Sequence, residues 1–316
     1  MPDDIKEFNA QDANLLARYR GAKPEAPAWF ETAVNTPYSE HFADVDGVRI
    51  RYQRWGDRSK PSLMLCHGNG AHAHWYDFIG PAMAAEYHVI AMTFSGMGDS
   101  DWRDSYDMDK FSAEQIAVCE HAGLFDDGRK PVIVAHSFGG FITMNMASRH
   151  SQKFAGVIIV DSPIRPPEDE WDGPPVRSTR NRVYANLEAG LARFRLAPPQ
   201  PCENHYIVDY IGRHSLKQVE NTAGQSGWTW KFDPGVFVKF DFDRTRSNLI
   251  DNITCKLSFM RGEDSVLVSD RIWDYMRGLR DDLETVSIPG AQHHVMLDQP
   301  LAFVQAVKDQ LRAWAY

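Results

Sequence analysis

The sequence has few cysteines, an excess of acidic over basic residues and no long apolar run, and each of these features excludes a class of protein. Four cysteines among 316 residues, none in a Cys-X-X-Cys spacing, provide neither a disulfide framework nor a zinc knuckle. Lys and Arg number 34 against 43 Asp and Glu, which argues against a non-specific nucleic-acid or membrane binder. The apolar runs are too short to span a bilayer, and no signal peptide is visible. We therefore expect a soluble, cytoplasmic globular protein without a nucleic-acid or membrane partner.

The hydrophobic pattern predicts an α/β architecture. Residues 41–55 alternate around Asp46-Gly47, which is typical of a β-hairpin. Continuous apolar runs separated by helical stretches follow, as expected for strands that are buried on both faces of a mostly parallel sheet with helices on both sides. These runs are Ser62–Cys66, His88–Met92, Pro131–Ala135 and Gly156–Val160.

The strand pattern stops near Pro163 and resumes at Cys255–Met260 and Leu283–Ile288. The sequence between is rich in proline and aromatic residues and contains no buried-strand run, so it predicts a mainly helical insertion. We expect four segments: an N-terminal arm over 1–40, a core formed by 41–163 together with 251–316, and a lid insertion over 164–250.

A candidate nucleophile, Ser137, lies directly after one buried run and directly before a helix. The segment Ala135-His-Ser-Phe-Gly139 has the G-x-S-x-G spacing of a nucleophile elbow, with alanine in the first position. Small residues are needed on either side of the serine because the turn is strained and other segments of the same chain pass close to it. The elbow exposes the hydroxyl at the positive end of a helix, where an oxyanion could form. The alternative is an ordinary strand-to-helix turn.

A glycine-rich segment, His67-Gly-Asn-Gly70, follows the run that ends at Cys66. Its glycines let the N–H of Asn69 turn toward a substrate carbonyl, and with the N–H of Phe138 it would form an oxyanion hole. Residues 68–73 also match the G-x-G-x-x-A dinucleotide fingerprint. That interpretation is disfavoured because no carboxylate ends the next strand to bind a ribose hydroxyl.

Acyl transfer also needs a base and a carboxylate that orients it. Asp264 stands just beyond a predicted strand, and His293 and His294 stand beyond the last predicted strand. Each lies at the carboxyl end of a strand, where open α/β sheets place their sites. The chain order of serine, aspartate and histidine is the one that a nucleophile elbow predicts.

These motifs together resemble those of the α/β-hydrolase superfamily, specifically the lid-bearing serine hydrolases related to carboxylesterases. The resemblance covers about residues 41–163 and 251–316. The segments that carry it are His67-Gly-Asn-Gly70, Gly96-Met-Gly-Asp-Ser100, Ala135-His-Ser-Phe-Gly139, Gly262-Glu-Asp264 and His293 with Asp298-Gln-Pro300.

The resemblance implies roles for particular residues. The catalytic histidine of this family stands seven residues before the closing proline, which selects His293 over His294. Gln292 stands where the family usually has glycine, and Ala135 replaces the commoner glycine of the elbow. Relatives with an aspartate nucleophile include dehalogenases and epoxide hydrolases, so a serine disfavours those chemistries. Asp161, after an earlier strand, is an alternative position for the acid.

The resemblance implies an enzyme that needs neither a cofactor nor a metal. We expect Ser137, His293 and Asp264 to cleave a carboxylic ester or a similar activated acyl compound. His136, Trp228 and Trp230 are candidates for the substrate pocket, although aromatic residues of a lid often form its own small core. A metal site of His67 with His72 and His74 is disfavoured, because no carboxylate completes it at helical spacing.

Other functions fit the same residues. The triad can also open lactones, hydrolyse C–C bonds, or act as a cofactor-free haloperoxidase or perhydrolase, and the fold does not choose among these. A non-enzyme alternative is a catalytically silent small-molecule receptor of the same fold. The sequence leaves the substrate and the oligomeric state open.

Overall fold

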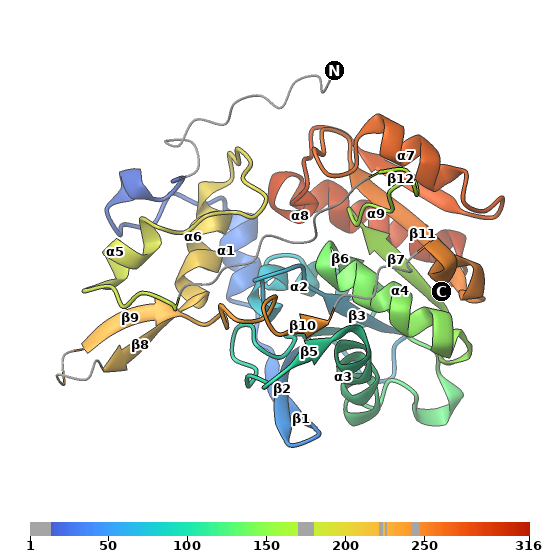
Figure 1. Cartoon of the computed structure of the whole chain (residues 1–316), viewed down its shortest axis with the longest axis horizontal. Coiled ribbons are helices and arrows are strands. Elements are labelled where there is room, and N and C mark those ends of the chain that lie inside the picture. The colour runs from blue at the N-terminus through green and yellow to red at the C-terminus, as the bar shows by residue number, and fades with distance from the viewer. Residues whose placement is uncertain (1–13, 170–179, 221–223, 225, 242–246) are drawn as a thin grey trace.

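The computed structural model describes residues 14–169, 180–220, 224, 226–241 and 247–316. An eight-stranded sheet forms the centre of the molecule, in the order β1-β2-β4-β3-β6-β7-β11-β12 (Figure 1). β1 and β2 form an antiparallel hairpin, β2 pairs antiparallel with β4, and the remaining pairs are parallel. The strands are β1 (Ser39–Val45), β2 (Val48–Trp55), β3 (Ser62–Cys66), β4 (His88–Met92), β6 (Val132–His136), β7 (Gly156–Val160), β11 (Lys256–Gly262) and β12 (Glu284–Ile288). The predicted α/β-hydrolase sheet and its opening hairpin are confirmed.

Helices cover both faces of the sheet. The helices are α1 (Ala28–Val34), α2 (Gly80–Met83), α3 (Met108–His121), α4 (Phe138–His150), α5 (Leu187–Leu191), α6 (His205–His214), α7 (Asp270–Arg277), α8 (Val295–Asp298) and α9 (Pro300–Ala313). Short 3-10 helices occupy Ala17–Tyr19, Ala73–Tyr76, Asp126–Gly128, Ser151–Lys153 and Ser247–Asn252. None of the described helices is both long and apolar enough to cross a membrane.

The central strands are apolar throughout because both of their faces are buried. Successive residues of β3 alternate between two hydrophobic clusters: Leu63 and Leu65 belong to one, Met64 and Cys66 to the other. The first cluster includes residues of α2, α8 and α9, and the second includes residues of α3, α4 and α7. Because successive side chains of a strand point to opposite faces of the sheet, each central strand contributes to both hydrophobic clusters.

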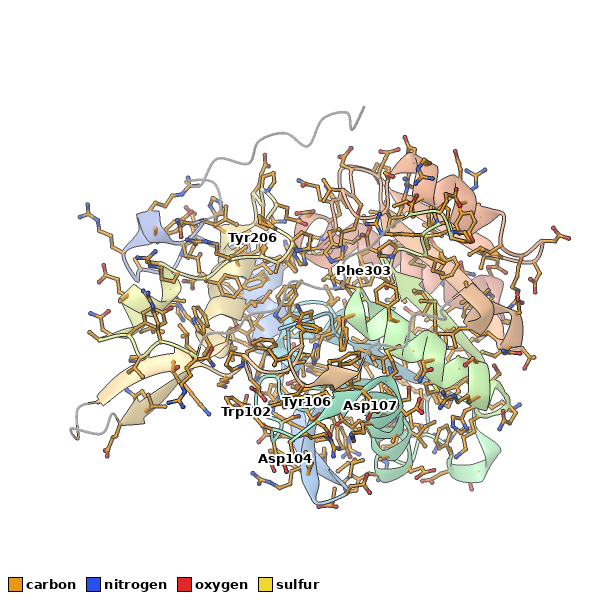
Figure 2. The ribbon with its side chains drawn as sticks, viewed as in Figure 1. Trp102, Asp104, Tyr106, Asp107, Tyr206 and Phe303 are labelled. Atoms are coloured by element: carbon orange, nitrogen blue, oxygen red, sulfur yellow. The ribbon has the colours of Figure 1, made fainter. Side chains whose placement is uncertain are left out.

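Between β7 and β11 the chain leaves the sheet. Figure 1 shows α5, α6 and the strands β8 (Leu216–Glu220) and β9 (Ser226–Trp230) at one side of the molecule, beside α1. β8 and β9 form an antiparallel hairpin that the sequence analysis did not predict. This part shares a core with the body, since Tyr206 of α6 packs against the cluster that contains Phe303 of α9 (Figure 2). We call the chain between β7 and β11 the insertion.

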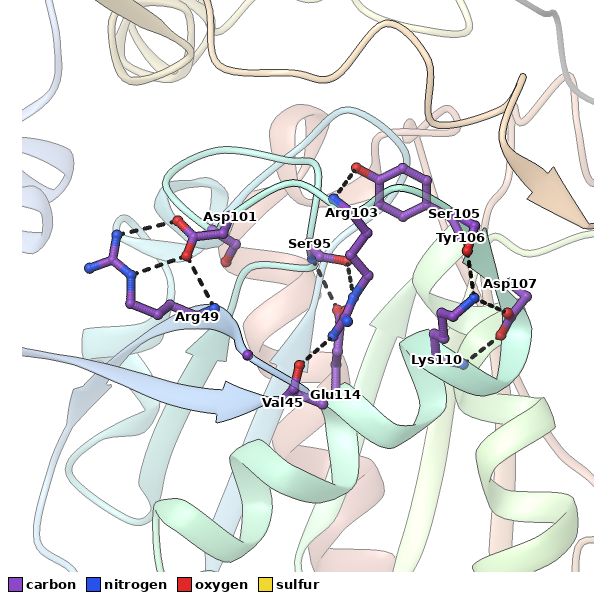
Figure 3. A network of polar contacts seen from close by, with 12 residues as sticks. Val45, Arg49, Ser95, Asp101, Arg103, Ser105, Tyr106, Asp107, Lys110 and Glu114 are labelled. Carbon is purple, nitrogen blue, oxygen red and sulfur yellow. Dashed lines mark hydrogen bonds and ion pairs between the residues drawn. The ribbon is translucent and has the colours of Figure 1, made fainter.

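A buried ion pair fixes the loop that follows β4 (Figure 3). Arg103 Nε donates to Glu114 Oε1 at 2.8 Å, and the two side chains are 8% and 0% exposed. Ser95 N donates to the second carboxylate oxygen at 3.0 Å. Tyr106, of β5 (Tyr106–Asp107), accepts a hydrogen bond from Arg103 N and donates one to Asp233 of the insertion. β5 also pairs with β10 (Phe240–Asp241), so the loop joins the body to the insertion at two points.

The end of β11 packs directly against the loop that leads to α8. A Cβ atom on Gly262 would lie 2.2 Å from Gln292 O and 2.4 Å from Ala291 O. Both obstacles are backbone atoms, so a side-chain rotation cannot relieve the overlap. Glycine at this position therefore lets the loop with His293 lie against the sheet.

We expect Gly262→Ala to lower the free energy of unfolding by about 2–3 kcal/mol, the range for a core that must move to admit a methyl group. Gly278→Ala is the matched control, because the nearest atom to its added Cβ is 3.5 Å away. Urea denaturation of the two variants measures the difference. Equal effects of the two substitutions would contradict the close backbone packing at Gly262.

Candidate active site

Ser137 stands at a sharp turn between β6 and α4. Its backbone angles, φ 52° and ψ −119°, lie in a region that residues other than glycine rarely occupy. Ser137 N donates to Val160 O at 2.8 Å, and Ser162 Oγ donates to Ser137 O at 2.8 Å, so β7 and the residues after it hold the turn. A Cβ atom on Gly139 would lie 2.4 Å from His67 O. The small residue that the spacing predicted is thus required by close packing.

His293 pairs with Asp161 in the interior. His293 Nδ1 lies 2.8 Å from Asp161 Oδ1, and the two side chains are 1% and 0% exposed. Because a carboxylate only accepts, Nδ1 carries the proton and the lone pair of a neutral ring is on Nε2. Asp161 follows β7 and also has a positive φ, 49°. No hydrogen bond joins Ser137 to His293 among the described atoms, and such bonds are often long before substrate binds.

The expectation that Asp264 orients the histidine is wrong in geometry. Asp264 is exposed, and the contact that the structure gives it is a backbone hydrogen bond from its N–H to Ala291 O at 2.9 Å. The loop after β11 instead supplies donors to Asp161: Gly262 N at 2.9 Å from Oδ2, and Ser265 Oγ at 2.7 Å from Oδ1. The alternative position, Asp161, carries the carboxylate that meets His293.

Two backbone N–H groups are free near Ser137. Those of Asn69 and Phe138 donate to no described residue, which leaves them available to an oxyanion. His67 fixes the preceding chain: its Nε2 accepts from Phe94 N at 3.0 Å, and its Nδ1 donates to Gly68 O at 2.7 Å. The neutral imidazole is required here, because Nε2 must keep its lone pair.

A small pocket lies over Ser137. Its lining consists of Gly68, Asn69, Ala71, Trp75, His136, Ser137, Ala197, His293 and His294. The free volume is about 10 Å³, enough for one water molecule. Three buried polar atoms of these residues have no described partner: Asn69 Oδ1, Trp75 Nε1 and His294 Nδ1. They are available to a polar ligand.

The predicted pocket residues divide into two groups. His136 lines the pocket, and its Nε2 donates to His293 O at 2.8 Å. Trp228 and Trp230 do not line it, which corrects the prediction. Both lie on β9, where Trp230 Nε1 donates to Tyr184 OH at 3.2 Å and Trp228 pairs with the backbone of Tyr184. Trp230 contacts the rings of Tyr184 and Phe194 of the insertion, and both tryptophans pack against the core that the insertion shares with the body.

Sequence reasoning missed the contributions of Trp75, Ala197 and His294 to the pocket. No local pattern marks Trp75 or Ala197 as a residue of the pocket. Ala197 belongs to the insertion. Residues shortly after it form hydrogen bonds with the segment that runs from His293 into α8. Gln200 Oε1 accepts from His294 N at 2.9 Å, and Asn204 Nδ2 donates to Leu297 O at 2.7 Å. The loop that carries His293 is therefore held from the body and from the insertion.

Burial makes two of the imidazoles beside the pocket, those of His136 and His294, weakly basic. It lowers the pKa of His136 and of His294 well below the ordinary value, and the neighbouring imidazole of His293 lowers both further. His136, His293 and His294 each offer one ring nitrogen, and these atoms lie within 4.8 Å of one another. Among the described residues, this is the group that could hold a metal ion.

A family model with the description "Alpha/beta hydrolase family" matches residues 63–306. This match spans more than half of the chain, both sides of the insertion and every residue of the site described above. The matched residues include the parallel strands from β3 to β12 and the site at their carboxyl ends. The chain belongs to the alpha/beta hydrolase family.

Curated relatives are similar to parts of the chain. A dihydrolipoyllysine-residue acetyltransferase component of an acetoin cleaving system from Pseudomonas putida is 31% identical over 121 residues, 38% of this chain and 32% of its own length. Bifunctional epoxide hydrolase 2 from Rattus norvegicus is 26% identical over 46% of this chain and 26% of its own length. A haloalkane dehalogenase from Sphingobium indicum is 27% identical over 42% of this chain and 45% of its own length. The chain spans less than half the length of these relatives.

Solved structures show the same fold. A thioesterase domain from the curacin biosynthetic pathway superposes with a TM-score of 0.71 at 17% identity. The match covers 86% of this chain and 100% of the thioesterase domain. An esterase from Mycobacterium tuberculosis superposes with a TM-score of 0.64 at 18% identity, over 95% of this chain and 98% of that one. At these identities the likeness extends to the fold alone.

The buried His67 predicts a specific dependence of stability on pH. Burial lowers its pKa from 6.5 to about 4. As the pH falls below 6.5, the unfolded chain takes up a proton at this position before the folded chain does, so the free energy of unfolding decreases until about pH 4. Between pH 7 and pH 5 we expect His67 to account for a loss of about 2 kcal/mol.

His67→Gln removes the titration while it keeps an acceptor for Phe94 N. Urea denaturation at pH 7 and pH 5 gives the free energy of unfolding of both proteins, and the other histidines cancel in the comparison. We expect a smaller decrease in the variant. Parallel curves for the two proteins would contradict the assignment of a buried, neutral His67.

Proposed function

We propose that this hydrolase is a serine hydrolase of carboxylic esters or similar activated acyl compounds. Ser137 is the nucleophile, His293 the general base and Asp161 the carboxylate that holds the imidazole in its working tautomer. The observation that carries the proposal is the 2.8 Å contact between His293 Nδ1 and the fully buried Asp161, beside a serine with the strained φ of 52°.

The proposed reaction proceeds in two halves. Ser137 Oγ attacks the carbonyl carbon while His293 Nε2 accepts its proton, and the N–H groups of Asn69 and Phe138 bind the oxyanion. His293 then gives the proton to the departing alcohol, which leaves an acyl group on Ser137. A water molecule that His293 activates releases the acid and restores the hydroxyl.

Substrate entry requires movement in the insertion. The pocket has a free volume of about 10 Å³, so an acyl group fits only if its wall moves. Ala197 is the insertion's contribution to that wall, and Gln200 and Asn204 hold the same segment on the histidine loop. We therefore assign the insertion the role of a lid that limits the access of water and substrate.

The relatives named as epoxide hydrolase and dehalogenase do not transfer their chemistry to this chain. The nucleophile position holds a serine, Ser137, where the aspartate-dependent members of the superfamily carry an acidic residue. A serine forms an acyl ester with carboxylic substrates, which supports the ester-cleaving assignment.

Covalent labelling with a fluorophosphonate, read by intact mass, tests the nucleophile. We expect one adduct on the wild-type protein and none on Ser137→Ala, with hydrolysis of short p-nitrophenyl esters reduced roughly 10⁴-fold or more in the variant. Ser162→Ala, a serine whose hydroxyl bonds Ser137 O, should still be labelled. A folded wild-type protein that takes no label would favour the receptor interpretation.

The identity of the acid can be tested separately. Asp161→Asn should lower kcat by about 10⁴-fold, because the amide favours the wrong tautomer of His293. Asp264→Asn should remain within about twofold of the wild type, since the carboxylate of Asp264 is exposed to solvent. Circular dichroism of both variants checks folding. A large loss in Asp264→Asn with little loss in Asp161→Asn would overturn the assignment.

A further inference from the structure

We propose that His136, His293 and His294 form a site for one transition-metal ion, such as Zn²⁺, and that an ion bound there inhibits the enzyme. Binding depends only on the three imidazoles. The inhibition rests on the proposed function, in which His293 is the general base. The two parts can therefore be tested independently.

Three rings converge from two segments of the chain. His136 ends β6, while His293 and His294 follow β12, and all three side chains are buried. The ring centroids lie 4.7 Å apart for His136 and His293, 4.8 Å for His293 and His294, and 5.7 Å for His136 and His294. Neutral imidazoles in such a group are the ligands that zinc, copper and nickel ions prefer.

Each ring has one nitrogen engaged with an acceptor. His136 Nε2 donates to His293 O at 2.8 Å, His293 Nδ1 donates to Asp161 at 2.8 Å, and His294 Nε2 lies 3.3 Å from Pro198 O. Carbonyl and carboxylate oxygens only accept, so these nitrogens carry the protons. Metal-binding histidines have the same arrangement, in which the outer N–H bonds a carbonyl or a carboxylate.

The second nitrogen of each ring therefore keeps its lone pair. These atoms are His136 Nδ1, His293 Nε2 and His294 Nδ1, and none has a hydrogen-bond partner in the part of the chain that the structure describes. His294 Nδ1 is buried and unpartnered, which is costly unless a ligand satisfies it. A Cβ atom at position 68 would lie 2.9 Å from His136 Nδ1, so a side chain at that position would crowd this nitrogen.

The space between the rings suits an ion. The pocket that they line with Ser137 has a free volume of about 10 Å³, and its other walls offer no carboxylate. One ring nitrogen of each histidine lies within 4.8 Å of the others, whereas the ligand nitrogens of a tetrahedral zinc site with Zn–N bonds of 2.0–2.1 Å are about 3.4 Å apart. The nitrogens thus need to approach one another by up to about 1.4 Å, and water or Ser137 Oγ would take the fourth position.

Such an ion would block the proposed reaction at its first step. It occupies the lone pair of His293 Nε2, which is the one that must accept the proton of Ser137. It also fills the place of the substrate carbonyl beside Ser137. Ions that prefer oxygen ligands, such as Mg²⁺ and Ca²⁺, should have no effect, because the site offers three nitrogen atoms.

Calorimetric titration with Zn²⁺ tests binding without any turnover. Ser137→Ala should bind one Zn²⁺ per chain, as should the wild-type protein. His136→Gln and His294→Gln keep an N–H donor for the carbonyl but lose the ligand nitrogen, so we expect at least a tenfold weaker affinity. His150→Gln, at the opposite end of α4, is the matched control and should bind like the wild type. The visible spectrum of Co²⁺ in the same proteins reports four-coordinate binding.

Inhibition is the second measurement. Zn²⁺ should abolish p-nitrophenyl ester hydrolysis by the wild-type protein at the concentration that saturates binding, and EDTA should restore it. Binding that is absent, or that survives both Gln substitutions unchanged, would overturn the site. Binding at the site with an unchanged ester rate would overturn the inhibition. A metal-free protein without ester turnover would instead count against the proposed function, and the binding result would stand on its own.

Discussion

The candidate site depends on one buried carboxylate. Asp161 is fully buried, and an unpaired charge in that position would cost several kcal/mol. Three donors satisfy it: His293 Nδ1–H, Ser265 Oγ–H and Gly262 N–H. These donors come from the loop before α8 and from the end of β11, while Asp161 itself follows β7. The carboxylate therefore fixes the relative positions of three segments. The imidazole of His293 is oriented because it supplies one of the hydrogen bonds that the buried charge of Asp161 requires.

The same arrangement explains why Asp264, in the loop after β11, is exposed to solvent. Its backbone turns so that Asp264 N reaches Ala291 O, and Ser265 takes the inward position beside Asp161. A second buried carboxylate there would meet Asp161 as a like charge, which is unfavourable at short distance. Serine adds a donor without adding a charge. An exposed Asp264 is thus the expected consequence of a carboxylate at position 161.

Local patterns were sufficient for the sheet and for the proposed nucleophile, whereas the choice of His293 over His294 came from the resemblance to the family. Apolar runs buried on both faces have few alternatives, and the strand, serine and helix of the elbow are adjacent in the chain, so Ser137 was predictable. The acid was not, because Asp161 and Asp264 each follow a strand, and only the folded backbone decides which side chain turns inward. Trp228 and Trp230 failed for a similar reason: aromatic composition predicts burial and does not say against which neighbour.

The pocket also depends on contacts between distant segments. Its walls come from the chain after β3, the turn at Ser137, the loop that carries His293, and the insertion. Ala197, the residue of the insertion, has no polar side chain that would mark it as part of a site. Gln200 of the insertion accepts a hydrogen bond from His294 N, while His136 of the elbow donates one to His293 O. The single peptide group that joins His293 to His294 is therefore held at both its N–H and its C=O. A movement of the insertion that opens the pocket releases the first of these bonds and leaves the second. In the proposed mechanism, His293 would then keep its hydrogen bonds to Asp161 and to His136 while the substrate enters.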